Sequence, residues 1–149
     1  MGQDSVKPFL DFENKWAIVL GLTSNIGSQD FQTLKLENGN FLFQKVLQTV
    51  ATWGSADQLM FVIGATKANE FAEIRKLIPD HFLLVPGVGA QGGDLESVSK
   101  YGFNKQCGLL VNSSRNIIYA STGVDFAVEA GKASKAIAEE MKDYLEKFL

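Results

Sequence analysis

The sequence contains a single cysteine, Cys107, and a single histidine, His81. One cysteine cannot form an internal disulfide, and these two residues are too few for a zinc site built on cysteine and histidine. Cys107 opens an apolar stretch and is expected to be a small core residue. His81 follows Asp80 and is expected to be a solvated loop residue. We therefore expect no metal centre.

The chain also lacks long apolar runs and a strong charge of one sign. No stretch approaches the length of a membrane span, and no signal-peptide pattern is present. The net charge is −3, without a basic patch interleaved with aromatic residues. Lys35, Lys67 and Arg75 are expected to be solvated charges. These features predict a cytoplasmic protein that binds neither membranes nor nucleic acid.

What the chain does have is an alternation of apolar runs and amphipathic segments. Its 149 residues are enough for one domain with a substantial core. Apolar runs predict strands at residues 16–22, 59–64, 82–85 and 108–112. Amphipathic segments predict helices at residues 40–53, 68–77, 94–100 and 125–148. Residues 31–39 are expected to form a short extended excursion with a turn at Asn38 and Gly39.

The most informative segment is the glycine-rich stretch from Leu84 to Asp94, which follows an apolar run and leads into a helix. Glycine permits positive φ and lets backbone N–H groups approach a ligand closely. A strand that feeds such a turn into a helix N-terminus is suited to bind an anion. Arg115 follows the next apolar run. Two such elements side by side would hold a phosphate, so we predict a phosphate-binding protein.

Two other interpretations of the glycines stay open. Residues 87–92 match G-x-G-x-x-G, the fingerprint of dinucleotide-binding folds. That fingerprint requires an acidic residue about 20 positions further on, and the strand at residues 107–112 contains none. The match is therefore weak. The glycines could also form a tight turn without any ligand.

The strands are apolar throughout and are separated by helices, which indicates an α/β protein with a parallel sheet covered on at least one face. Polar side chains follow the strand ends, where parallel sheets bind ligands. They are Thr23, Ser24, Asn25, Thr66, Gln91 and Arg115. Four such units fit a small open sheet or half of an eight-stranded TIM barrel. In that barrel the phosphate site lies between the loops after strands 7 and 8. We therefore predict that residues 1–149 form the C-terminal half of a TIM (β/α)8 barrel, with strands 5 to 8 parallel and covered by helices.

The motifs resemble those of orotidine 5′-phosphate decarboxylase, within it the subgroup found in mycobacteria and several other bacteria. The resemblance covers essentially all 149 residues. It rests on the runs DSVKPF from Asp4, TSN from Thr23, GAT from Gly64, FLLVPGVGAQGGD from Phe82 and NSSRNIIYA from Asn112. The PGVGAQGG run is highly specific for this family.

The resemblance implies orotidine 5′-phosphate as substrate and UMP as product, and it gives roles to individual residues. Arg115 matches the arginine that binds the phosphate, assisted by backbone amides of both loops. Gln91 matches a glutamine that covers the bound nucleotide, and Ser24 matches a serine that hydrogen-bonds the pyrimidine. Without the resemblance, Ser24 would be interpreted as a helix cap. The implied substrate-binding residues are Ser24, Gln91, Gly92, Gly93, Ser114 and Arg115.

The implied reaction is a cofactor-free loss of CO₂ from C6 of the pyrimidine, after which a lysine protonates the carbanion-like centre. In the family that lysine belongs to an alternating Lys/Asp array with the motif Asp-x-Lys-x-x-Asp. The sequence has no such motif. Residues 1–5 resemble the family's sequence directly after its fourth strand. We therefore expect that the catalytic N-terminal half is missing and that this chain binds the nucleotide without decarboxylating it.

A half barrel would leave the edges of strands 5 and 8 unpaired, and unpaired edges invite association. We therefore expect self-association or pairing with the missing half. Two other functions stay open. One is a non-catalytic module that binds a nucleotide or phosphate on the same half barrel. The other is a different phosphate-binding TIM-barrel enzyme, such as a relative of indole glycerol phosphate synthase.

Overall fold

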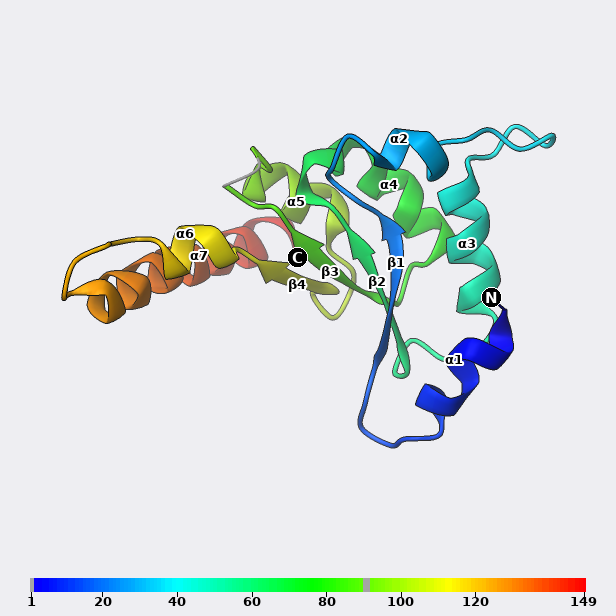
Figure 1. Ribbon diagram of the computed structural model, residues 1–149, viewed down its shortest axis with the longest axis horizontal. Helices are drawn as coiled ribbons and strands as arrows, with labels where there is room; N and C mark the ends of the chain where they lie inside the picture. Colours follow the sequence, from blue (N-terminus) through cyan, green and yellow to red (C-terminus); the bar gives the residue numbers. More distant parts are fainter. Residues whose placement is uncertain (1, 90–91) are drawn as a thin grey trace.

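The computed structural model describes residues 2–89 and 92–149. Its centre is one parallel four-stranded sheet in the order β1-β2-β3-β4 (Figure 1). The strands are β1 (Ala17–Leu22), β2 (Leu59–Ile63), β3 (Phe82–Pro86) and β4 (Leu109–Asn112). Each strand therefore pairs with its neighbours in sequence. The predicted α/β class is confirmed, and the strand bounds differ from the predicted ones by one residue at most.

Four longer helices lie close to the positions that the sequence predicts. They are α3 (Leu42–Ala51), α4 (Ala68–Leu77), α5 (Leu95–Gly102) and α7 (Phe126–Phe148). The sequence analysis missed the remaining elements, which are α1 (Gln3–Leu10), α2 (Ser28–Phe31), the 3₁₀ turn η1 (Ala65–Lys67) and α6 (Ser114–Ile118). The turn at Asn38 and Gly39 is confirmed, since Gly39 has a φ of 83° and its N–H donates to Leu36.

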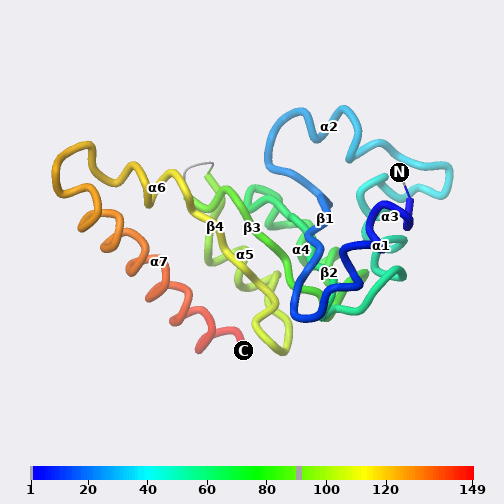
Figure 2. Tube along the Cα trace, turned by 60° about the horizontal axis from the view of Figure 1, so that its bottom comes forward, coloured from blue at the N-terminus to red at the C-terminus, as the bar shows by residue number. Residues whose placement is uncertain are grey.

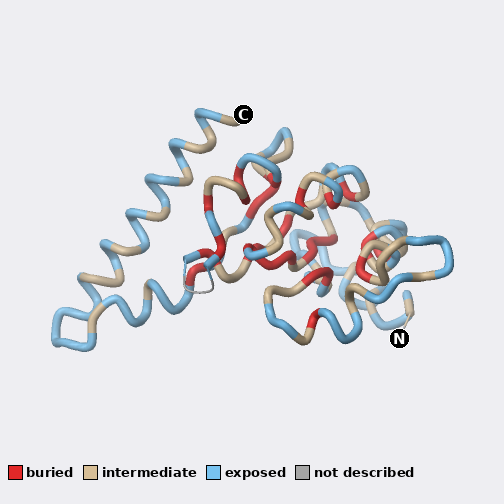
Figure 3. Tube along the Cα trace, turned by 90° about the horizontal axis from the view of Figure 1, so that it is seen from above, coloured by how far each residue is buried: buried red, intermediate tan, exposed pale blue. Residues whose placement is uncertain are grey.

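The core lies between the sheet and the helices α3, α4 and α5. Alternate strand residues face these helices, and Phe61, Leu83 and Val85 are fully buried there. They meet Leu47 of α3 and Phe71 of α4. Figure 3 shows the buried segments gathered in the middle of the molecule. Because side chains alternate along a strand, the intervening residues point to the other side of the sheet.

That other side, which we call the open face, is defined by Ile18, Leu20 and Leu110. These apolar side chains are 46%, 56% and 50% exposed. Burial on the open face is deepest at the central strands, where Met60 is 8% exposed. The continuous apolar runs of the sequence thus supply a buried layer on one side of the sheet and an uncovered apolar layer on the other.

Helix α7 closes the chain beside β4. Figure 2 shows it running back from the loop after α6 along the β4 side of the sheet. None of its residues is buried, and Ile137, Met141 and Tyr144 contact the core. The helix therefore presents one apolar stripe to the molecule and leaves most of its surface exposed.

The expectation that Arg75 is a solvated charge is wrong. Its guanidinium is largely buried at the amino-terminal edge of the sheet, and burial lowers the pKa of Arg75 to about 10 against smaller opposite effects of Cys107 and Asp80. The group donates hydrogen bonds of 2.6 to 3.3 Å to backbone carbonyls. The acceptors are Ile78, His81, Gly102 and Gly108. Arg75 thus ties the ends of α4 and α5 to the start of β4.

The expectation for His81 is also wrong. Both ring nitrogens are buried and have no hydrogen-bond partner within the described part of the chain. The ring lies 5.4 Å from that of Phe61, centroid to centroid. Burial lowers the pKa of His81, against a smaller opposite effect of Asp80. His81 is therefore a half-buried loop residue whose ring packs against Phe61, not a solvated one. Cys107 packs against the core as expected.

Replacing Arg75 with alanine should lower the free energy of unfolding by about 3 kcal/mol, because it leaves four backbone carbonyls without their charged donor. Urea unfolding measures this loss. The matched control is Lys76→Ala, which removes the next cation of α4. Lys76 makes only an exposed ion pair with Glu73, and its loss should cost about 0.5 kcal/mol or less. Equal effects of the two substitutions would contradict the role of Arg75.

Candidate functional site

The candidate site forms where β3 and β4 end. The two strands are paired in register up to Pro86 and Asn112. The segments that follow them therefore start side by side, as the sequence analysis predicts. We call residues 87–89 and 92–93 the glycine loop, and residues 113–116 the arginine loop. Between them lies a cavity of about 100 Å³, lined by Pro86, Gly87, Val88, Asn112, Ser113, Ser114 and Arg115.

The glycine loop folds back on itself. Gly87, Gly89 and Gly92 have φ angles of 95°, 72° and 79°, which only glycine adopts readily. The N–H of Gly92 donates to the carbonyl of Gly89 at 2.8 Å, and the N–H of Gly93 donates to Gly87 at 3.2 Å. The two amides that the resemblance implies for phosphate binding therefore already have partners inside the loop. A phosphate would have to share them.

The N-terminus of α5 is occupied by its own cap. The Asp94 carboxylate accepts hydrogen bonds from the backbone N–H groups of Glu96 and Ser97. Hydrogen bonds from Ser97 lower the pKa of Asp94, chiefly the one from its side chain. A carboxylate at this place repels a second anion. The N–H groups of Glu96 and Ser97 at the start of α5 are therefore already hydrogen-bonded, and the cationic group for an anion would come from the arginine loop.

Arg115 supplies that group from the first turn of α6. Arg115 is exposed, and no carboxylate within residues 2–89 and 92–149 forms an ion pair with it. The hydroxyl of Ser114 donates to Oδ1 of Asn112 at 2.7 Å, which fixes the start of the helix. The guanidinium keeps its charge and its fork of donors for an anionic ligand.

Ser24 follows β1, the edge strand at the opposite end of the sheet from β4. Its hydroxyl is buried and has no partner among the described residues. It rests on Gly64 at the end of β2, where an added Cβ would be 2.1 Å from Oγ of Ser24. Ser24 does not cap a helix, because α2 begins at Ser28 with Gly27 as its N-cap. An unpaired buried hydroxyl is costly, and a ligand on this side of the sheet would satisfy it.

Of the predicted site residues, Ser114 and Arg115 line the same cavity, and Gly92 and Gly93 belong to the loop beside it without lining it. Ser24 follows β1, at the opposite end of the strand order. Gln91 lies outside the described residues. The sequence analysis missed Asn112 and Ser113, which line the cavity beside Arg115. Their position directly after an apolar run was the available signal, since side chains at the carboxyl ends of parallel strands face the ligand.

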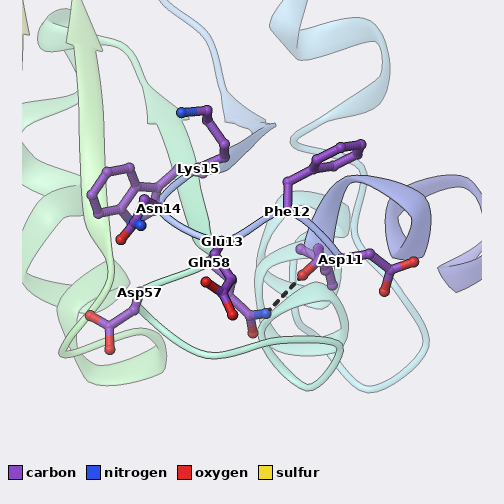
Figure 4. A pocket seen from close by; sticks show the side chains of 9 residues that line it. Asp11, Phe12, Glu13, Asn14, Lys15, Asp57 and Gln58 are labelled. Carbon is purple, nitrogen blue, oxygen red and sulfur yellow. Dashed lines mark hydrogen bonds between the residues drawn. The ribbon is translucent and has the colours of Figure 1, made fainter.

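A larger cavity of about 520 Å³ lies at the opposite edge of the sheet, around the loop between α1 and β1 (Figure 4). Acidic and basic side chains, among them Asp11, Glu13 and Lys15, surround it together with Asp57. A hydrogen bond of 3.0 Å from Gln58 to the carbonyl of Leu10 closes one side. None of the predicted site residues lines this cavity.

No group of three or more His, Cys, Asp or Glu side chains in residues 2–89 and 92–149 is arranged to hold a metal ion. Over the same residues, no helix is both long and apolar enough to cross a membrane.

A parallel sheet with helices on one face and facing loops after its last two strands defines the class, which is part of a (β/α)8 barrel. Comparisons with known proteins give the family. The orotidine 5′-phosphate decarboxylase of Bacteroides fragilis is 54% identical over 149 residues, covering 100% of this chain and 54% of that protein. The enzyme of the same name from Flavobacterium johnsoniae is 57% identical over 146 residues, or 98% of this chain and 53% of that protein.

Solved structures agree. The structure of Leishmania donovani OMP decarboxylase is 30% identical, with a TM-score of 0.80 over 97% of this chain and 54% of that chain. No protein-family model matches the sequence. The chain is a homologue of orotidine 5′-phosphate decarboxylase, and it spans about half the length of the curated relatives it matches. The resemblance and the fold class that the sequence analysis stated are confirmed.

Replacing Gly93 with alanine should destabilise the glycine loop. An added Cβ would lie 2.3 Å from Cβ of Ala65 and 2.8 Å from the carbonyl oxygen of Gly87. Such crowding costs about 2 kcal/mol, which urea unfolding would detect. The control is Gly131→Ala in α7, where an added Cβ meets nothing within 4 Å. It should stabilise the chain by about 0.5–1 kcal/mol. A neutral Gly93→Ala variant would contradict the close approach.

Proposed function

We propose that the protein of which this sequence forms part is an orotidine 5′-phosphate decarboxylase, which converts orotidine 5′-phosphate to UMP and CO₂. Residues 1–149 form the C-terminal half of its barrel and hold the substrate's phosphate. The observation that carries the proposal is the cavity between the glycine and arginine loops with Arg115 at its rim. The names of the curated relatives support it.

The volume of the cavity limits which part of the nucleotide it can enclose. About 100 Å³ is well below the roughly 300–1,000 Å³ of pockets that enclose a whole small ligand. It suits the phosphate group alone, bound by the guanidinium of Arg115 and by polar groups of Ser114, Gly92 and Gly93. The nucleoside then extends over the open face towards Ser24, whose hydroxyl bonds the pyrimidine. Gln91 is proposed to cover the bound nucleotide.

The catalytic residues for the decarboxylation are proposed to lie outside this chain. No residue of this chain is assigned a catalytic role, and the proposed reaction needs no cofactor. The phosphate contact lies far from the reacting carbon, so it contributes remote binding energy that offsets the cost of ordering and desolvating the substrate. This chain alone is expected to bind the nucleotide without decarboxylating it. A non-catalytic nucleotide-binding module would bind in the same way, and the relatives' names favour the enzyme.

We also propose that the open face is covered in the working protein. The exposed apolar residues Ile18, Leu20 and Leu110 lie on it. Neither β1 nor β4 has a partner on its outer edge among the described residues. A groove of about 320 Å³ also lies between β4 and α7. The cover is either a second copy of the chain or the other half of the barrel. Alone in solution, the chain is expected to self-associate.

Replacing Arg115 with alanine should weaken UMP binding by about 10- to 100-fold, because hydrogen bonds to a charged group are worth about 1.5–3 kcal/mol. Isothermal titration calorimetry of the 149-residue chain with UMP measures this. The matched control is Lys105→Ala, which removes an exposed cation from the loop before β4, at the opposite edge of the sheet. It should bind UMP normally. Equal binding by the Arg115 variant would contradict the proposed phosphate site.

The wild-type chain should sediment as a species heavier than its 16.3 kDa monomer at micromolar concentration. Leu110→Glu places a charge on the open face and should shift it towards the monomer. Leu34→Glu is the control, since Leu34 is similarly exposed, at 51%, but lies in the loop after α2. Analytical ultracentrifugation distinguishes these outcomes. A wild-type chain that remains monomeric would rule out self-association through this face.

A further inference from the structure

We propose that Ser113 is a positioning residue. Its side chain holds the glycine loop and the arginine loop at a fixed separation, and that separation determines how tightly a phosphate is bound. The ligand in this inference rests on the proposed function. The geometry does not, because it is a property of the two loops themselves.

The first observation is a buried hydrogen bond between the loops. The hydroxyl of Ser113 donates to the carbonyl oxygen of Val88 at 3.2 Å. Ser113 and Val88 are each 7% exposed. In the described part of the chain, this is the one hydrogen bond that joins the two loops. The neighbouring Ser114 differs, because its hydroxyl bonds to Asn112 at the end of its own strand.

The second observation is a close approach one residue further along the glycine loop and three residues further along the arginine loop. The amide side chain of Asn116 lies against Gly89, where an added Cβ would be 2.1 Å from Nδ2 of Asn116. Gly89 also has a φ of 72°, which disfavours any other residue. Residues three apart lie on the same side of a helical turn. Ser113 and Asn116 therefore contact Val88 and Gly89 from one side of α6.

Arg115 lies between these two contacts in sequence. Any movement of α6 away from the glycine loop would move the backbone of Arg115 with it. The glycine loop is otherwise held by hydrogen bonds within itself, and glycine-rich backbone loses much conformational entropy when it is ordered. A site that is ordered before the ligand arrives binds more tightly, because the ligand does not have to supply that ordering.

Removing the Ser113 hydroxyl would leave the carbonyl of Val88 buried without its partner. Such a group is costly, and the simplest way to relieve it is for the loop to open towards water. The expected effect is therefore a looser glycine loop, with the core of the sheet unchanged.

Hydrogen exchange tests this without any ligand. In Ser113→Ala, the amides of Gly89, Gly92 and Gly93 should exchange about three- to tenfold faster than in the wild type. Amides of β2 should not change. Ser121→Ala is the control, because the hydroxyl of Ser121 bonds to Asp125 in the connection to α7. Unchanged exchange in the glycine loop of Ser113→Ala would overturn the proposal.

Ligand affinities separate positioning from a general loss of structure. Ser113→Ala should weaken binding of UMP about three- to tenfold and leave uridine, which has no phosphate, unaffected. In the Arg115→Ala background the same substitution should weaken UMP binding less than it does in the wild type, because the arginine that it positions is absent. Equal losses for uridine, or additive losses in the double variant, would overturn the positioning role. If the wild type does not bind UMP, the proposed function fails, and the exchange experiment still decides on Ser113.

Discussion

The parallel pairing of β3 with β4 decides where the site of this protein forms. Because the strands run in register up to Pro86 and Asn112, the segments that follow β3 and β4 leave the sheet at the same level. The glycine loop and Arg115 meet there without any long-range adjustment. A shift of register would separate them by several ångströms. The core layer of Phe61, Leu83 and Val85 under α4 and α5 holds that register.

The sequence was sufficient for the strands, the longer helices and the meeting of the two loops, because each follows from local periodicity or from the rule that parallel strands end at one edge. It was not sufficient for partners that depend on distant backbone. Arg75 is a surface cation by its place in an amphipathic helix, yet it reaches carbonyls 27 and 33 residues away. His81 has the pattern of a loop residue and lies in a loop, but its ring is half-buried because it packs against Phe61.

The anion site shows the same limit. A glycine-rich turn before a helix suggests free amides, but the composition of the turn does not reveal where its N–H groups donate. Here Gly92 and Gly93 bond within the loop, and Asp94 caps the helix. The positive charge of Arg115 therefore carries more of the proposed phosphate binding than the motif alone indicates. The backbone of the two loops shapes the cavity, and the side chain of Arg115 supplies its positive charge.

The outer edges of β1 and β4, which have no partner strand among residues 2–89 and 92–149, have a consequence for symmetry. They are different surfaces on strands that point the same way, so an edge of one copy can only meet the opposite edge of the next in a parallel sheet. Such a contact is head-to-tail. It closes into a ring when the curvature of each copy completes the circle, and it continues as a filament when the curvature does not. The curvature of this sheet therefore determines whether the assembly is a closed ring of fixed size or an open-ended polymer.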